Sequence, residues 1–315
     1  MIHTGEFFIM LNINDEEDKK TIEMLNKIKV YNQGPFRIVC RKTKIGKYDV
    51  SRLHMYVDFI ELLGKADIVE NDVGDIIFKI RQVLECLICN NEFDLILSRL
   101  DYRYDVLIPD KNERELIIKL LKKSMTNVSY MKKVRKYRNT VRYFSKSRSD
   151  NIYDKEIERL AKKKKIKPYE KDILRFEAQV KNEHIKYKNK KFKIDRSFEE
   201  YFTMKLYKFY MEKMIISVVG EGDFYSLREA QKIINKSNIK DKEKNELREF
   251  LVYTSRKRNL SKTKEKYGRY KFSKNTNMLR ELGINSIIIP EKWRVKKINN
   301  PLKELIKKFN YEDSY

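Results

Sequence analysis

The chain has 315 residues, 41% of them hydrophobic, so it is long enough to bury a sizeable core and is not disordered by default. It carries 71 Lys and Arg against 46 Asp and Glu, a net charge of +25. Residues 1–100 contain 14 basic and 16 acidic side chains, and the 57 basic and 30 acidic ones that remain all follow. A lysine-rich codon bias does not explain a near-neutral first third, so we expect a polyanionic partner, a nucleic acid.

The sequence also argues against a membrane-spanning protein and against a disulfide-stabilised one. No run of 18 or more apolar residues is present, and the N-terminus lacks the basic start of a signal peptide, so we expect a cytoplasmic protein without a membrane segment. Three cysteines imply no disulfide framework. Cys86 and Cys89 form a CxxC within an apolar run, and without further ligands nearby we expect core packing rather than a zinc site.

The first half of the chain mixes strand and helix patterns. Residues 36–40 indicate a strand, and residues 53–63 fit either a strand or a short helix. Apolar residues at helical spacing predict a helix over 75–89. Residues 95–106 alternate at period two, which predicts a strand, and a helix follows over 112–123.

Two further strands are predicted at 140–144 and around Ile152 and Tyr153, joined by a polar turn. A charged helix is expected over 156–165. Residues 174–181 then alternate cleanly between apolar and polar side chains, as a strand does.

After about residue 198 the pattern becomes helical. It includes a capping box at Ser226 and Glu229, a helix ending at Gly283, a strand-like stretch over 287–290 and a short terminal helix over 302–309. The sequence therefore predicts an α+β protein. We expect one domain with a central, mostly antiparallel sheet and flanking helices over residues 1–200, and a helical, basic region over 201–315.

Carboxylates lie beside arginines on the polar faces of two predicted strands, in Arg99-Leu100-Asp101 and Arg175-Phe176-Glu177. If these strands are neighbours, Asp101 and Glu177 converge on one hard cation such as Mg²⁺ or Mn²⁺. Asp105 shares the face of Asp101 but lies about 13 Å further along a regular strand. We therefore assign it a supporting role. The alternative is a set of solvated or salt-bridged strand faces.

A tyrosine followed at +2 by a lysine occurs at Tyr153 and Lys155. Such a phenol could act as a covalent nucleophile if a cation favoured its phenolate form. Composition alone does not select Tyr153 from 20 tyrosines.

Taken in order, several short motifs resemble the rolling-circle replication initiators of plasmids and filamentous-type phages, in particular the replication proteins of the gene II/X type. They span roughly residues 95–302, and the N-terminal 90 residues match only vaguely. The motifs are Leu97-Ser98-Arg99-Leu100-Asp101, Thr140 to Phe144 with Ser147-Arg148, Ile152-Tyr153-Asp154-Lys155 with Glu158, Leu174-Arg175-Phe176-Glu177, Gly222 to Ala230, Leu282-Gly283-Ile284-Asn285, Ile289-Pro290 and Asn300-Pro301.

The resemblance implies an enzyme that nicks the origin strand, stays on the 5′ phosphate through a tyrosine and leaves a 3′ hydroxyl. In related plasmid initiators the nucleophile is the tyrosine of a Tyr-x-Lys motif, which is Tyr153 here, and Tyr143 is the rival. Lys155 would offset phosphate or phenolate charge. The resemblance also implies a divalent metal, Mg²⁺ or Mn²⁺, on Asp101 and Glu177. Glu158 could be a further ligand or a base, and the alternative for it is a role on the helix surface.

One departure concerns histidine. Many nicking initiators carry a His-hydrophobe-His metal motif, whereas this chain has His3, His54 and His184, widely separated. The metal must therefore be held mainly by carboxylates. His54 or His184 could contribute one ligand, although a lone histidine is more often structural.

Basic side chains interleaved with tyrosines are the expected contacts to single-stranded or hairpin origin DNA, since cations follow phosphates and aromatic rings stack on bases. A host helicase and polymerase are further expected partners, with the protein a monomer or a dimer. The alternatives are a non-catalytic origin-binding protein and a relaxase of plasmid transfer. The expected DNA contacts are Arg99, Lys132, Lys133, Arg135, Lys136, Arg148, Arg175, Arg256, Lys257, Arg258 and Arg269.

Overall fold

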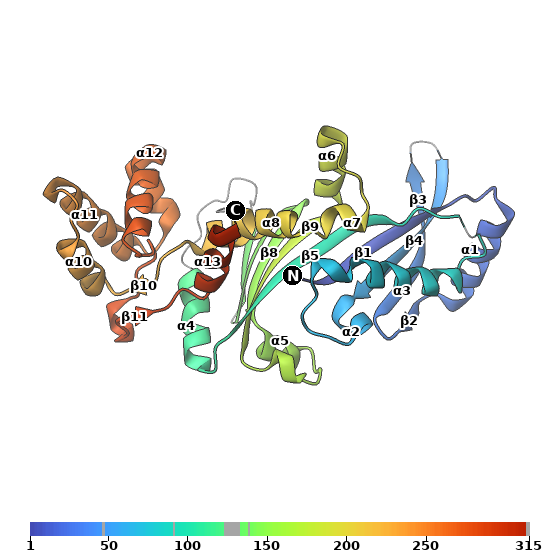
Figure 1. Cartoon of the computed structure of the whole chain (residues 1–315), viewed down its shortest axis with the longest axis horizontal. Coiled ribbons are helices and arrows are strands. Elements are labelled where there is room, and N and C mark those ends of the chain that lie inside the picture. The colour runs from blue at the N-terminus through green and yellow to red at the C-terminus, as the bar shows by residue number, and fades with distance from the viewer. Residues whose placement is uncertain (46–47, 91, 123–132, 138, 313–315) are drawn as a thin grey trace. The chain divides into compact units, whose positions relative to one another are not determined.

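The computed structural model describes residues 1–45, 48–90, 92–122, 133–137 and 139–312. Among these residues nine strands form one sheet (Figure 1), and the printed registers of β1 with β4 and β5, of β3 with β2 and β4, and of β6 with β7 are antiparallel. The fold is α+β, as predicted. In sheet order the strands are β2 (Tyr31–Gln33), β3 (Phe36–Ile45), β4 (Tyr48–Asp58), β1 (Ile2–Leu11), β5 (Ile96–Leu107), β9 (Ile173–Lys181), β8 (Arg148–Asp154), β7 (Thr140–Phe144) and β6 (Lys133–Tyr137).

Helices flank this sheet and make up most of the C-terminal region (Figure 1). They are α1 (Glu16–Ile28), α2 (Phe59–Leu63), α3 (Val73–Glu85), α4 (Lys111–Leu121), α5 (Lys155–Ala161), α6 (Asn182–Phe192), α7 (Phe198–Tyr201), α8 (Met204–Tyr210), α9 (Ser217–Val219), α10 (Leu227–Lys236), α11 (Asp241–Lys257), α12 (Leu260–Glu281) and α13 (Lys303–Glu312). A π-helix, Met211–Ile216, joins α8 to α9. Within the described part of the chain, no helix is long and apolar enough to cross a membrane.

The chain divides into two compact units, each built from separated stretches of sequence. Unit 1 comprises Met1–Tyr104, Lys146–Ser149 and Glu177–Tyr210, and unit 2 comprises Asp105–Ser145, Asp150–Phe176 and Met211–Tyr315.

The core of unit 1 is aromatic. Phe7 of β1 lies edge-on to Phe198 of α7, with ring centroids 5.7 Å apart, and Tyr102 of β5 stacks on Tyr210 of α8 at 5.2 Å. Because side chains alternate along a strand, Phe7 and Tyr102 point away from Glu6 and Asp101, their neighbours in sequence. Helices thus cover the apolar face of these strands, and polar side chains lie on the other.

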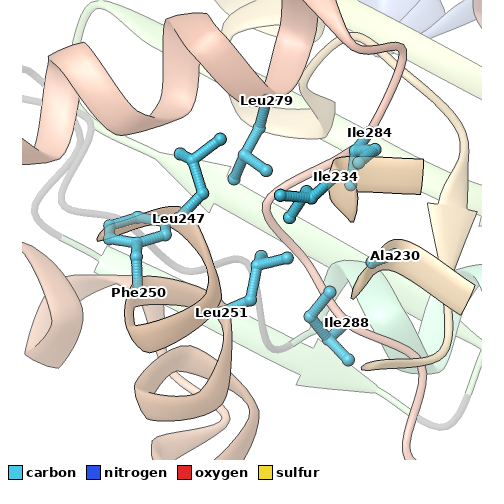
Figure 2. Close-up of a cluster of buried hydrophobic side chains, with 8 residues drawn as sticks. All are labelled: Ala230, Ile234, Leu247, Phe250, Leu251, Leu279, Ile284 and Ile288. Atoms are coloured by element: carbon cyan, nitrogen blue, oxygen red, sulfur yellow. The ribbon is translucent and has the colours of Figure 1, made fainter. Parts of the chain in front are cut away.

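The C-terminal helices of unit 2 enclose their own core. Buried side chains from α10, α11 and α12 pack together with Ile284 and Ile288 (Figure 2). Ser226 caps α10 by accepting the backbone N–H of Glu229 (3.4 Å), and Gly283 follows α12 with φ +69°, so both predicted helix boundaries are confirmed. The helical stripes of this region therefore come from one packed helical group.

Two local predictions were wrong. The predicted strand over 287–290 forms only one isolated bridge, between Ser226 and Ile289, because the chain bends at Ser286 and Ile287. Cys86 and Cys89 are exposed rather than packed in the core, since α3 ends at Glu85 and the chain turns there.

Candidate active site

The two strands that carry the predicted metal ligands, β5 and β9, are neighbours in the sheet, which was the condition for Asp101 and Glu177 to converge. In unit 1 the carboxylate of Asp101 is 1% exposed and lies across the sheet from Thr4. Its Oδ1 accepts from Arg99 Nε (2.8 Å), and its Oδ2 accepts from Arg99 Nη2 (2.5 Å) and Thr4 Oγ1 (2.6 Å), with Gln179 Nε2 at 3.3 Å. Since a carboxylate oxygen offers about two lone pairs, Oδ2 is saturated and only Oδ1 has capacity left.

Arg99 is held by two carboxylates. Besides Asp101, its Nη1 donates to Glu6 Oε1 at 2.6 Å, and both acidic partners raise the pKa of the guanidinium, against the opposing effect of its burial. The pair of Arg99 and Asp101 is therefore a charge-assisted, bidentate contact within one strand. Arg99 was predicted to contact DNA, but its guanidinium already binds Asp101 and Glu6.

Glu177 has a histidine beside it. His3 Nε2 lies 3.2 Å from Glu177 Oε1, and both side chains are largely buried. The register of β1 against β5 shifts between Ile2 and Thr4, so His3 is the extra residue of a β-bulge and its ring lies beside β9. The other ring nitrogen of His3 is buried and has no hydrogen-bond partner. His3 was not predicted as a ligand from the sequence.

The two histidines named as possible ligands lie elsewhere in unit 1. His54 packs against Phe8, with ring centroids 6.1 Å apart, and burial followed by Arg41 and Arg52 lowers its pKa. His184 Nε2 lies 3.1 Å from the hydroxyl of Tyr210, and burial lowers its pKa to about 4. Both rings have packing partners of their own.

In unit 2, Tyr153 and Lys155 lie where β8 gives way to α5. Asp154 caps the helix through Oδ1, which accepts the N–H of Ile157 at 3.1 Å. The cap makes Tyr153 the penultimate residue of the strand and Lys155 the first of the helix. The ammonium nitrogen of Lys155 lies 5.8 Å from the ring centroid of Tyr153, and both side chains are more than nine-tenths buried.

Lys155 is surrounded by charge. Its Nζ lies 2.9 Å from Glu158 Oε2 and 3.6 Å from Glu170 Oε1. Burial lowers the pKa of Lys155, and the nearby charge of Arg175 lowers it further, while Glu158 opposes both effects. The predicted ligand Glu158 also pairs with Lys162, so its two oxygens face two ammonium groups.

Glu170 was not identified from the sequence. It ends the 3-10 turn Pro168–Glu170, is 2% exposed, and accepts from Arg159 Nε at 2.7 Å and from the backbone N–H of Lys167 at 3.1 Å. Its position beside Lys155 depends on that turn, which no periodicity indicates.

Three further predicted residues lie in unit 2. Arg175 is 1% exposed and binds Asp105 through two contacts, Nε to Oδ1 at 2.7 Å and Nη2 to Oδ2 at 2.8 Å. Both oxygens of Asp105 are therefore bonded to the guanidinium of Arg175. Arg175 was predicted to contact DNA, but a phosphate contact requires an exposed side chain and Arg175 is buried. Tyr143 is 1% exposed, and its hydroxyl donates to the carbonyl of Leu121 at 3.2 Å. Its phenol is therefore anchored in the core.

Arg114 of α4 fixes the chain around Tyr153. Its Nε lies 2.7 Å from Asp154 Oδ2, and its other nitrogens lie 3.0 Å from Asp172 and 3.2 Å from Glu156. The side chain is 1% exposed, and its carboxylate partners raise its pKa, whereas burial opposes them. The start of α5 is therefore tied to α4 and to the segment that precedes β9.

The predicted DNA contacts differ in accessibility. Arg256, Lys257, Arg258 and Arg269 are all exposed; the first three lie at the end of α11, and Arg269 lies within α12, next to Gly268. Arg148 is half-buried and contributes to the lowered pKa of His184. Lys133, Arg135 and Lys136 lie on β6, and Lys132 is outside the described residues.

Across the ranges that the structure describes, no group of three or more His, Cys, Asp or Glu side chains is arranged to hold a metal ion. Asp101, Glu177 and His3 belong to unit 1, and Tyr153, Lys155 and Glu170 belong to unit 2.

No protein-family model matches the chain, and a search of the curated proteins finds no match either.

Proposed function

We propose that this protein initiates rolling-circle DNA replication in the cytoplasm of a bacterial host, as an origin-specific single-strand endonuclease and strand transferase with Tyr153 as nucleophile. The observation that carries the proposal is the pairing of Tyr153 with the buried ammonium of Lys155, which Glu158 and Glu170 hold near the tyrosine ring. A buried cation beside a phenol favours the phenolate, the form that attacks phosphorus. The positive charge of the chain after residue 100 supports DNA as the substrate.

In the proposed reaction, the Tyr153 oxygen forms a bond to phosphorus while the bond from phosphorus to the 3′ oxygen breaks. The phenol proton passes to solvent, and the departing 3′ oxygen takes up a proton. The 5′ phosphotyrosyl ester preserves the energy of the phosphodiester, so a later 3′ hydroxyl can reverse the step and close a circle. A host helicase and polymerase would act on the released 3′ end.

A divalent cation fits the donors of Glu177 and His3 better than those of Asp101. In an octahedral site with bonds of about 2.1 Å, neighbouring ligand atoms lie about 3 Å apart, and Glu177 Oε1 lies 3.2 Å from His3 Nε2. A carboxylate with an imidazole favours Mn²⁺ over Mg²⁺. When bound, the metal would supply Lewis-acid chemistry to a DNA phosphate held at this part of unit 1.

The proposal is tested with 3′-labelled single-stranded fragments that cover the DNA on both sides of the gene. Incubation with Mn²⁺ is expected to produce a labelled protein band that survives SDS, since the nucleophile keeps the 5′ phosphate of the labelled piece. The band should be absent with Tyr153→Phe and should persist with Tyr143→Phe. Wild-type protein that binds one fragment and forms no band would refute the nickase.

A second candidate function is origin binding without cleavage. It is favoured by the pairing of three predicted ligands, Asp101, Asp105 and Glu158, with Arg or Lys side chains. Under this alternative the same fragments give a mobility shift and no covalent band at any Mn²⁺ concentration. The relaxase alternative would show the band only with DNA from a transfer origin.

A further inference from the structure

A cavity of about 480 Å³ lies in unit 2, between α12, α13 and the π-helix Met211–Ile216 with α9. We call it the α12–α13 pocket. Its volume falls in the usual range for small-molecule sites, roughly 300–1,000 Å³. None of its lining residues belongs to the nicking constellation around Tyr153.

The wall of the pocket formed by residues 219–222 and 284–287 is fixed by two asparagines. Asn285 Nδ2 donates to the carbonyl of Val219 at 3.0 Å, and Asn300 Nδ2 donates to the carbonyls of Gly220 (2.8 Å) and Gly222 (2.9 Å). Gly222 has φ +82°, and a Cβ there would lie 2.7 Å from the carbonyl carbon of Ile284. The wall is therefore preformed, which lowers the ordering cost of binding.

The lining offers flat aromatic surface together with amide and hydroxyl groups. Phe272 of α12 is half-buried and offers the larger ring surface, whereas Phe309 of α13 is 1% exposed, and Ile216 adds aliphatic surface. Thr276 and Asn277, on the next turn of α12, contribute a hydroxyl and an amide. Aromatic faces stack on any nucleobase, and amides bond to base edges.

Charged groups of both signs line the same pocket. Lys264 is exposed and forms no ion pair with any described residue, while Arg280 reaches Glu221 only at 3.5 Å. Two carboxylates, Glu212 and Glu221, balance these two cations. A ligand with one phosphate and an amino-bearing ring matches this set, because ammonium and guanidinium groups bind phosphate and carboxylates accept from ring amino groups.

We propose that the α12–α13 pocket binds one unpaired nucleotide, with its base against Phe272 and its phosphate at Lys264 and Arg280. The proposal rests on the proposed function, in which the substrate is single-stranded or hairpin DNA that exposes unpaired bases. The occupant is a nucleotide rather than a peptide, because the excess charge of the surrounding chain is positive and exposed cations continue along α12 at Lys266 and Arg269.

The test uses the full chain and the four deoxynucleoside 5′-monophosphates, each titrated separately by saturation-transfer NMR, with inorganic phosphate as a further probe. Asn277→Trp fills the pocket from an exposed position, and Ser273→Trp places the same side chain on α12 at an exposed position outside it. Lys264→Ala removes a lining cation, and Lys262→Ala removes an exposed cation of the same helix that does not line the pocket.

At least one monophosphate should bind with a Kd of about 1 mM or lower, weakened about tenfold by Asn277→Trp and about threefold by Lys264→Ala. Both control variants should stay within about twofold of the wild type. Equal losses in lining and control variants would overturn the pocket, as would phosphate binding as tightly as a nucleotide, or no binding up to about 10 mM. Covalent adduct formation by the same preparation separates the two proposals: an adduct without nucleotide binding refutes the pocket alone, and pocket-dependent binding without an adduct refutes the nickase alone.

Discussion

Replacing Arg114 by methionine should destabilise unit 2 because it leaves a buried carboxylate uncompensated. Arg114 is 1% exposed and lies 2.7 Å from Asp154, itself 1% exposed. Removing one partner of a buried ion pair costs about 3–5 kcal/mol of the free energy of unfolding. Asp154 keeps its helix-capping bond to Ile157, so we expect the lower end, about 3 kcal/mol.

The assay is urea unfolding followed by circular dichroism, on Arg114→Met, on Asp154→Asn and on the double variant. Asparagine still caps a helix, so the double variant removes the stranded charge and keeps the cap. It should recover at least about 1 kcal/mol relative to Arg114→Met. The claim that Arg114 compensates the buried charge of Asp154 would be wrong in either of two cases. One is an Arg114→Met variant whose free energy of unfolding lies within about 0.5 kcal/mol of the wild type, and the other is a double variant no more stable than Arg114→Met.

Three further predictions follow from named contacts. His3→Gln should weaken Mn²⁺ binding, measured by electron paramagnetic resonance, by about tenfold or more, whereas His54→Gln should not; equal losses would remove His3 from the metal site. The pKa of His184 is about 4 in the folded chain and near 6.5 when exposed, so the unfolded chain binds more protons between these values and stability falls as the pH drops through them. Allowing for solvent screening, the loss from pH 7 to pH 5 should be about 1–2 kcal/mol in urea unfolding and should be smaller in His184→Gln. Neutralising Arg256–Arg258 should reduce the slope of log K against log salt for single-stranded DNA by about 2, and an equal reduction from neutralising the three lysines of α1 would show that the contact is nonspecific.

Periodicity predicted the sheet strands of the site well. The alternation over residues 95–106 and 174–181 placed Asp101 and Glu177 on strands that are neighbours, β5 and β9. The same alternation put arginines and carboxylates on one face, but it could not say which pairs form. That depends on register and reach: Arg99 bonds Asp101 within its own strand, whereas Arg175 bonds Asp105 of another.

Two residues of the candidate site, His3 and Glu170, could be identified only from the three-dimensional structure. His3 lies beside Glu177 because a bulge shifts the register of β1, and a bulge adds one residue without changing the local composition. Glu170 lies beside Lys155 through a 3-10 turn that follows a lysine-rich bend. In both cases irregular backbone brings the two side chains close together, and the periodicity of the sequence does not predict irregular backbone.

The most direct test of the central claim is to identify the tyrosine in the covalent adduct. Trypsin cleaves after Arg142, Lys146, Arg148 and Lys155, so Tyr143 and Tyr153 fall in different peptides, residues 143–146 and 149–155. The adduct formed with Mn²⁺ is trimmed by nuclease and digested, and the peptide that carries a nucleotide is found by mass spectrometry. We expect the modification on peptide 149–155, at Tyr153. Modification of peptide 143–146, of any other tyrosine, or of none would contradict it.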